Sequence, residues 1–249
     1  MIARRGGSAA GTTSRGNDSA LRVVVPKGAL FDDSVRMLAE AGLDTSALES
    51  PGRNLLVGGA GVEFVIAKPT DVPVYVAYGA ADCGIGGKDV LLEAGLDLVE
   101  LVDLGFGGCR FVVAEPEGAP DLAERYGHLG VLRVATKYPR ITEQHFAERG
   151  VQVEIVKLNG NIELAPLIGI ADVIVDITAT GTTLRQNHLR IVEDVLPSTA
   201  RFVANPAALR TDGRVVELAD TLASMMAAKG IESEARSGVP APHGRDPRP

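Results

Sequence analysis

One stretch of the chain, residues 172–184, combines residue types that could bind a phosphorylated sugar. It reads DVIVDITATGTTL, in which a short apolar run ends at Asp176 and threonines surround Gly181. Such a run predicts a buried strand of a parallel sheet, and the glycine and threonines predict a loop that leads into a helix. Backbone N–H groups at a helix N-terminus bind phosphate, and an acidic side chain at the carboxyl end of a strand suits ribose hydroxyls. The stretch therefore predicts a ribose-phosphate site, although packing and capping alone also produce such patterns.

Size, charge and cysteine usage exclude several other classes of protein. The 249 residues suffice for one large or two small domains, and the net charge of −7 without runs of Arg or Lys gives no broad basic surface for nucleic acid. Cys83 and Cys109 have no CxxC partner, which argues against a disulfide framework or a zinc site and favours a reducing cytoplasm. No apolar stretch is long enough to span a membrane, and Arg4-Arg5 lacks the apolar segment of an export signal.

Strand and helix patterns alternate from about Leu21 to about Gly230, which predicts an α/β fold with largely parallel sheets. Strands are expected at 21–25, 55–57, 63–66, 82–86, 99–102, 110–114, 131–136, 151–158, 173–175 and near 203–204. Helices are expected at about 31–42, 71–78, from 87, 120–126, 138–150, from 159, after 181 and around 215–225.

The order of these elements suggests two lobes with a ligand cleft between them. Lobe I would comprise residues 21–105 and about 186–230, and lobe II residues 106–185 with the phosphate loop. The connector Gly105-Phe106-Gly107-Gly108 is either a hinge between the lobes or a plain loop. Residues 1–20 and 231–249 are expected to be disordered tails.

Several other residues at strand ends could contact a ligand. Lys27 and Gly28 follow the first strand, so they either contact phosphate or are simply solvated. Tyr138, in a strand-to-helix loop, either stacks on a base or packs, and Glu163 in the first turn of a helix suits the helix dipole. The sequence around Lys88 resembles a P-loop only superficially, because no Ser or Thr follows the lysine and the first glycine is absent.

Taken together, these residues resemble a known family. The run Glu163-x5-Gly169-x-Ala171-x2-Ile174-x-Asp176-Ile177-x2-Thr180-Gly181-x-Thr183-Leu184 closely resembles the motif of ATP phosphoribosyltransferases, the first enzymes of histidine biosynthesis. Four other stretches agree in the same order: VPKGAL (25–30), KPTDVPVYVAYGAADCGIGGKDVL (68–91), DLGFGGCRFVVA (103–114) and ATKYPRIT (135–142). The resemblance covers nearly all of residues 21–210.

The resemblance implies a fold and a reaction. The fold would have two lobes like those of type II periplasmic binding proteins. The reaction would be displacement at C1 of phosphoribosyl pyrophosphate by N1 of the ATP adenine, with release of pyrophosphate. N1 already carries a lone pair, so catalysis can come mainly from positioning and from stabilising charge on the leaving group. Mg²⁺ would travel with the pyrophosphate oxygens rather than in a protein cage.

The resemblance also divides the site residues between the two substrates. Asp176 would hold the ribose hydroxyls, and Glu163 would contact the ribose or the metal-bound leaving group; with Lys27 these form the expected catalytic set. The 5′-phosphate would lie in the loop formed by Thr178, Ala179, Thr180, Gly181, Thr182 and Thr183. ATP would be bound by Lys27, Gly28, Arg53, Lys68 and Lys88 at its phosphates and by Asp82 and Tyr138 near the adenine.

Only one expected helix and a tail follow residue 210, so the resemblance is to the short form of the family. Long-form relatives carry a further histidine-binding domain. Short-form chains need a second, regulatory subunit that resembles histidyl-tRNA synthetase, and by resemblance the assembly would be a hetero-octamer with histidine feedback. Two positions depart from the family pattern: Ala29, where the family often has arginine, and His188, where it often has glycine.

Three other functions compete with this interpretation. A binding protein without catalysis fits two lobes, but the export signal is missing and the phosphate loop is present. A type I phosphoribosyltransferase usually has two adjacent acidic residues before its threonine-rich loop, whereas Ile177 follows Asp176 here. A non-catalytic interaction subunit leaves the charged residues at strand ends unexplained.

Overall fold

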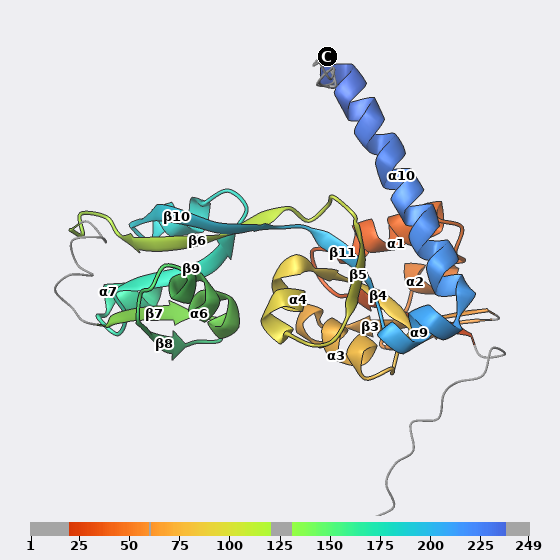
Figure 1. The fold of residues 1–249 in the computed structure, drawn as a ribbon, viewed down its shortest axis with the longest axis horizontal. Helices are drawn as coiled ribbons and strands as arrows, with labels where there is room; N and C mark the ends of the chain where they lie inside the picture. The colour runs from red at the N-terminus through yellow and green to blue at the C-terminus, as the bar shows by residue number, and fades with distance from the viewer. Residues whose placement is uncertain (1–19, 60, 121–130, 238–249) are drawn as a thin grey trace, which may run out of the picture.

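The computed structural model of the chain describes residues 20–59, 61–120 and 131–237, which form two β-sheets with helices packed against them (Figure 1). The expected tails lie outside these ranges, apart from Ala20 and from residues 231–237, which continue the last helix. The helix expected at 120–126 also lies outside the described residues, except for Pro120.

The first sheet has six strands in the order β2-β3-β1-β4-β11-β5. Its centre is parallel, because β1 pairs in parallel with both β3 and β4, whereas the pairings of β2, β11 and β5 are antiparallel. The strands are β1 (Leu21–Pro26), β2 (Leu56–Gly58), β3 (Val62–Ala67), β4 (Cys83–Gly87), β5 (Val99–Asp103) and β11 (Ala200–Ala204).

The second sheet has five strands in the order β10-β6-β9-β7-β8. Here β7 pairs in parallel with β8 and β9, while β6 pairs antiparallel with β9 and β10. The strands are β6 (Cys109–Pro116), β7 (Leu132–Thr136), β8 (Val153–Lys157), β9 (Val173–Thr178) and β10 (Leu189–Ser198).

The sheets differ from the sequence predictions in two details. The sheets are mixed rather than largely parallel, because β6 carries the chain into the second sheet and β10 carries it back, so the two strands run in opposite directions. Strand β10 was not predicted, and it keeps residues 189–198 in the second sheet, beyond the expected lobe boundary near 186. We propose that lobe I resumes at Thr199, just before β11.

Helices cover both faces of each sheet (Figure 1). Beside the first sheet lie α1 (Phe31–Glu40), α2 (Ser46–Glu49), a 3₁₀ turn (Pro69–Asp71), α3 (Val72–Ala77), α4 (Lys88–Ala94), α9 (Pro206–Thr211) and α10 (Gly213–Ser237). Beside the second sheet lie α6 (Pro139–Glu148), α7 (Leu164–Leu167) and α8 (Thr182–Gln186).

The apolar strands of both sheets are buried on two faces. In β1, Val23 packs on the side of α1 and α10, and Val24 packs on the side of α3. In the second sheet, Phe146 of α6 and Leu184 of α8 belong to the cores on opposite faces. This two-sided burial explains why the strands read as continuous apolar runs, and each large buried side chain stabilises the fold by about 1.5–3 kcal/mol.

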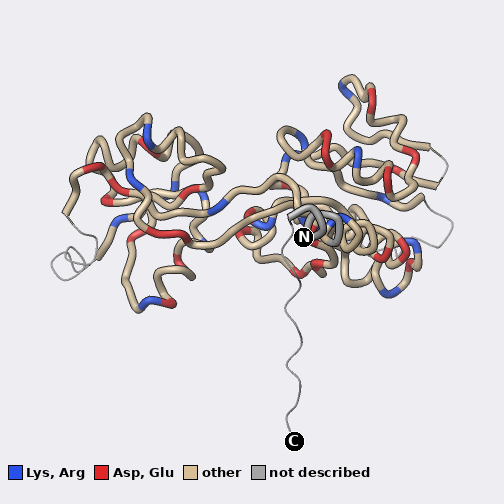
Figure 2. The backbone as a smooth tube through the Cα atoms, turned by 90° about the horizontal axis from the view of Figure 1, so that it is seen from above, with Lys and Arg blue, Asp and Glu red and all other residues tan. Residues whose placement is uncertain are grey.

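The last helix, α10, is amphipathic as predicted: Val215, Leu218 and Leu222 are buried in the core of the first sheet. Its far end extends away from that sheet (Figure 1). None of the helices in the described part of the chain combines the length and the apolar character needed to cross a membrane. Charges of both signs are interspersed over both lobes (Figure 2), in agreement with the scattered Lys and Arg of the sequence.

Candidate active site

The loop between β9 and α8 is folded by its own side chains. Thr178 Oγ1 accepts a hydrogen bond from the Gly181 N–H group at 2.8 Å, and the hydroxyl oxygens of Thr180 and Thr182 lie 2.8 Å apart. Gly181 has φ +72°, a conformation that glycine adopts at little cost. The turn leaves Ala179, Thr180, Thr182 and Thr183 exposed at the carboxyl end of β9.

Arg185 adds a positive charge to this loop. Its guanidinium donates to the backbone oxygen of Thr180 at 3.0 Å and to Thr182 Oγ1 at 3.2 Å. The sequence analysis did not select Arg185, although its position one turn into the helix after the loop is a usable signal. Hydroxyls, backbone N–H groups and a guanidinium together form a surface suited to an anion such as phosphate.

Asp176 lies next to the loop, and its residue is only 8 % exposed. Burial raises the pKa of its carboxyl above the ordinary value, while the N–H group of Ile177, bonded at 2.9 Å, and the charge of Lys137 oppose the rise and Glu163 adds to it. The structure therefore places Glu163 and Lys137 within electrostatic reach of Asp176. A poorly solvated carboxylate of this kind can accept strong hydrogen bonds from sugar hydroxyls.

The carboxyl ends of three parallel strands meet at this edge. The register pairs Thr136 of β7 with Lys157 of β8 and with Val175 of β9. Lys137 and Tyr138 follow β7 directly, and Asn159 follows β8 by two residues. Ligand-binding residues are expected at such an edge, yet of these three only Tyr138 was selected from the sequence.

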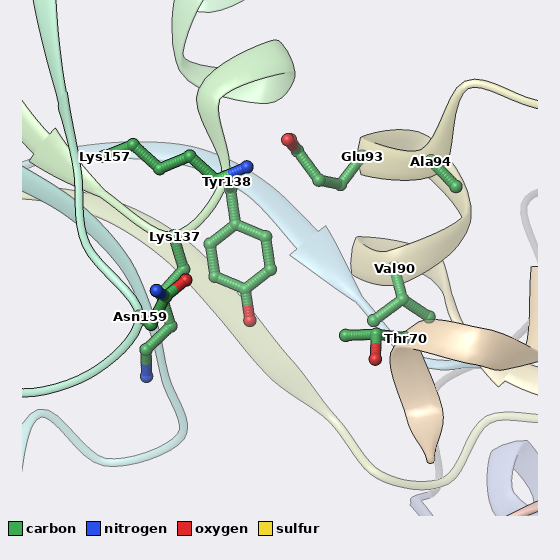
Figure 3. Close-up of a pocket in the computed structure, with 8 residues that line it drawn as sticks. All are labelled: Thr70, Val90, Glu93, Ala94, Lys137, Tyr138, Lys157 and Asn159. Atoms are coloured by element: carbon green, nitrogen blue, oxygen red, sulfur yellow. The ribbon is translucent and has the colours of Figure 1, made fainter. Parts of the chain in front are cut away.

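A cleft of about 360 Å³ lies beside this edge and is lined from both lobes (Figure 3). The second lobe contributes two lysines, an aromatic ring and an amide, and the first lobe contributes residues that follow β3 or belong to α4. The lining residues are Thr70, Val90, Glu93, Ala94, Lys137, Tyr138, Lys157 and Asn159.

Tyr138 presents a ring to the cleft (Figure 3) while its edge-to-face contact with Phe111, with centroids 4.7 Å apart, holds it in place. Burial raises the pKa of its phenol above the usual range, and the carboxylates of Asp89 and Asp176 add to the rise. The hydroxyl therefore stays protonated at neutral pH and can act as a hydrogen-bond donor.

Four of the predicted ATP contacts lie at one edge of the first sheet. Lys27 and Gly28 follow β1, and Lys68 follows β3 and is two residues from Thr70 of the cleft. Arg53 precedes β2, which runs antiparallel to β3, so it lies at the edge where β3 ends. All four are exposed.

The two remaining predicted ATP contacts differ from these four, Asp82 in its position and Lys88 in its pairing. Asp82 precedes β4 and accepts a hydrogen bond from the backbone N–H group of Arg22 at 2.8 Å, so it lies at the amino ends of β1 and β4, the opposite edge of the sheet. The Lys88 ammonium forms an ion pair with the Glu100 carboxylate of β5 at 2.5 Å. The positive charge that was expected to face polyphosphate is therefore paired within the protein.

Among the described residues, no group of three or more His, Cys, Asp or Glu side chains is arranged to hold a metal ion. The two thiols in this part of the chain, Cys83 and Cys109, are both free.

Comparison with known proteins decides the family. The sequence model of ATP phosphoribosyltransferase matches residues 68–227, a range that contains the whole cleft and the β9–α8 loop. The chain belongs to the ATP phosphoribosyltransferase family. It is 50 % identical over 206 residues to the ATP phosphoribosyltransferase of Rubrobacter xylanophilus, covering 82 % of this chain and 94 % of that protein. It is also 50 % identical to the ATP phosphoribosyltransferase of Moorella thermoacetica, covering 78 % and 87 %.

Solved structures agree with this assignment. The ATP phosphoribosyl transferase (HisG:HisZ) complex from Thermotoga maritima contains a chain that matches with a TM-score of 0.69 and 32 % identity, over 81 % of this chain and 98 % of that one. The fold of the ATP phosphoribosyltransferase family is of the periplasmic-binding-protein type. Tv2483, solved with L-arginine, matches with a TM-score of 0.54 at 17 % identity, which shows a likeness of fold alone.

Proposed function

We propose that the cleft and the β9–α8 loop form the active site of an ATP phosphoribosyltransferase in the first step of histidine biosynthesis. In this reaction N1 of the ATP adenine forms a bond to C1 of phosphoribosyl pyrophosphate, and the bond from C1 to the pyrophosphate oxygen breaks. The observation that carries the proposal is the buried Asp176 carboxylate beside a hydroxyl-rich loop that Arg185 supplies with positive charge.

The phosphoribosyl half of the substrate would lie against the second lobe. Asp176 accepts hydrogen bonds from the ribose hydroxyls, and the loop of residues 178–183 holds the 5′-phosphate together with Arg185. Glu163 lies within electrostatic reach of Asp176 and makes a further contact to the ribose or to the leaving group. The pyrophosphate enters as its Mg²⁺ complex, which is part of the substrate.

ATP would occupy the cleft between the lobes. Tyr138 offers a ring for the adenine and a phenolic donor, and Lys137 and Lys157 offer charge from the second lobe. From the first lobe, the edge that carries Lys27, Gly28, Arg53 and Lys68 would contact phosphates. Asp82 and Lys88 are left outside the proposed site, because one lies at the far edge of the sheet and the other is paired with Glu100.

Catalysis in this arrangement needs no strong base, because adenine N1 attacks through its own lone pair. The protein residues position C1 and N1 in line, and the cations of the cleft stabilise the charge that develops on pyrophosphate. Lys27 and Lys137 are the candidates for this second role, one from each lobe.

We also propose a regulatory partner. The Thermotoga maritima relative was solved as a HisG:HisZ complex. By analogy, this chain would assemble in the cytoplasm with a subunit resembling histidyl-tRNA synthetase, as a hetero-octamer with histidine feedback.

The test is an absorbance assay with ATP, phosphoribosyl pyrophosphate and Mg²⁺, with and without a synthetase-like subunit. Product that forms only with the partner supports both the reaction and the partnership. Product from the chain alone keeps the reaction and removes the obligatory partner. If the folded chain with its partner bound forms no product, the proposed reaction is contradicted. The alternative of a binding protein without catalysis would then be favoured.

A further inference from the structure

The two lobes touch beside the cleft, where the end of α4 meets the start of α6. The Glu93 carboxylate of α4 accepts hydrogen bonds from the backbone N–H groups of Arg140 and Ile141, at 3.2 and 3.1 Å. These donors belong to the first turn of α6, and the residue before that helix, Tyr138, provides no side-chain cap. A helix N-terminus in one lobe is thus capped by a carboxylate from the other lobe.

A second contact runs in the opposite direction at the same place. The Arg140 guanidinium of α6 lies over Gly95, the residue that ends α4 with φ +57°, so closely that a Cβ built on Gly95 would be 2.5 Å from the guanidinium carbon. The C-terminus of a helix carries partial negative charge and favours a cation. Each of the two helix ends is therefore complemented by a charge from the opposite lobe.

Both charges oppose the dipole of the helix that carries them. Glu93 lies in the last turn of α4, where a negative charge is unfavourable, and Arg140 lies in the first turn of α6, where a positive charge is unfavourable. Each charge is favourable only when α4 and α6 meet. Separation of the lobes would leave the charges of Glu93 and Arg140 uncompensated. The two reciprocal contacts therefore favour the one arrangement of the lobes in which α4 and α6 meet.

The contact also bears on the cleft. Glu93 is one of the cleft residues and extends from α4 toward the second lobe (Figure 3). Lys137 and Tyr138 immediately precede α6, so the position of this helix decides where their side chains lie. Whatever holds α6 against α4 therefore sets the distance between the cleft residues of the two lobes.

We propose that Glu93 is a positioning residue for the ATP phosphoribosyltransferase reaction. Together with Arg140 it locks α6 to α4, and the lock holds Lys137 and Tyr138 across the cleft from the first lobe. Glu93 acts through these two residues and touches no reacting atom. The kinetic consequence rests on the proposed function, whereas the lock is a property of the fold and is measurable without turnover.

The kinetic test compares Glu93→Ala and Glu93→Gln with Glu143→Ala. Glu143 is an exposed carboxylate on α6 and serves as the control for loss of charge. Misplacement of a site by about 1 Å can lower turnover by about 100-fold, so kcat/KM of Glu93→Ala should fall by about 10- to 100-fold. Glu93→Gln should recover part of the loss, because its amide oxygen still accepts an N–H bond, and Glu143→Ala should match the wild type.

Amide hydrogen exchange tests the lock directly in the full-length chain. Glu93→Ala should accelerate exchange at Arg140 and Ile141. The decisive variant is Arg140→Ala, which leaves the Glu93 carboxylate and the Ile141 N–H group intact and removes an unfavourable charge from α6. If Glu93 is only a local helix cap, the Ile141 N–H group should stay protected from exchange in Arg140→Ala. If the two contacts together lock the lobes, loss of the Arg140 contact should loosen the lock, and exchange at the Ile141 N–H group should accelerate.

The outcomes separate the two proposals. Unchanged exchange at Ile141 in Arg140→Ala reduces Glu93 to a helix cap and overturns the lock. Normal kcat/KM in Glu93→Ala overturns the positioning role. If the wild type makes no product even with its partner, the proposed function and the positioning role fall together, and the exchange data still decide whether the lock exists.

Discussion

Replacing Asp176 by asparagine keeps the size of the side chain and an acceptor for the Ile177 N–H group, but removes the buried charge. The effects on stability and on activity should have opposite signs. Burial raises the pKa of this carboxyl above its reference value of 3.8, which means that the fold disfavours the ionised form.

The effect on stability follows from this direction. Because the pKa of Asp176 is higher in the folded state than in the unfolded state, protonation of this carboxyl stabilises the folded wild type. This contribution to the free energy of unfolding is fully present below pH 3.8 and is lost as the pH rises through the folded-state pKa. Each unit of elevation corresponds to about 1.4 kcal/mol at neutral pH. At pH 7 the Asp176→Asn variant should therefore be at least as stable as the wild type, and the difference should shrink as the pH falls toward 4.

The effect on activity should be a large loss. Hydrogen bonds to a charged group contribute about 1.5–3 kcal/mol each, and Asp176 is proposed to accept two from the ribose hydroxyls. The loss of the charge should therefore lower kcat/KM by about 10²- to 10⁴-fold.

The measurements are urea unfolding at pH 4.5 and pH 7 and steady-state kinetics with both substrates varied. Asp220→Asn is the matched control, because this exposed carboxylate on α10 changes the net charge equally and should alter neither quantity. The reasoning is refuted if Asp176→Asn is clearly less stable than the wild type at pH 7, or if it retains normal kcat/KM.

Three further predictions concern the loop, the cleft and the core. Gly181→Ala should raise KM for phosphoribosyl pyrophosphate by about tenfold in steady-state kinetics, since a Cβ at φ +72° is strained by about 1–2 kcal/mol and would lie 3.1 Å from the Arg185 guanidinium. Tyr138→Phe should weaken ATP binding by about three- to tenfold in calorimetry while the Phe111 contact keeps the unfolding midpoint unchanged; an unchanged affinity would mean that the phenol contacts no substrate. Phe146→Ala should lower the free energy of unfolding by about 3–5 kcal/mol in urea, because the side chain is fully buried.

Strand β9, which leads into the phosphate loop, was predictable because both of its faces are buried. Val173, Ile174 and Val175 pack alternately on the α6 side and the α7 side of the second sheet, which leaves a continuous apolar run as the signal. Strand β10 gave no such signal, because its residues are exposed or half-buried along most of its length. Its pairing with β6 is a tertiary fact that periodicity alone does not contain.

The two predicted ATP contacts that we leave outside the proposed site differ in what the sequence could reveal about them. Lys88 does lie at the carboxyl end of β4, and only the fold brings Glu100 of β5 to its ammonium group. Asp82, in contrast, could have been rejected from chain direction alone, because it precedes its strand and so lies at the amino end. The rule that selects Asp176, that ligands bind at carboxyl ends, rejects Asp82.

Chain direction also gives an indication of the contact between the lobes. Once the bounds of α4 and α6 are predicted, Glu93 in a last helical turn and Arg140 in a first helical turn both stand where the helix dipole disfavours their charge. Charges that oppose their own helix need a partner from elsewhere in the fold, and two opposite ones on helices of different lobes can satisfy each other. Glu93 and Arg140 are 47 residues apart, so no local sequence pattern shows that they pair. Each charge can nevertheless be recognised as unfavourable for its own helix once the helix ends are predicted, and the two charges then indicate the surfaces along which the lobes meet.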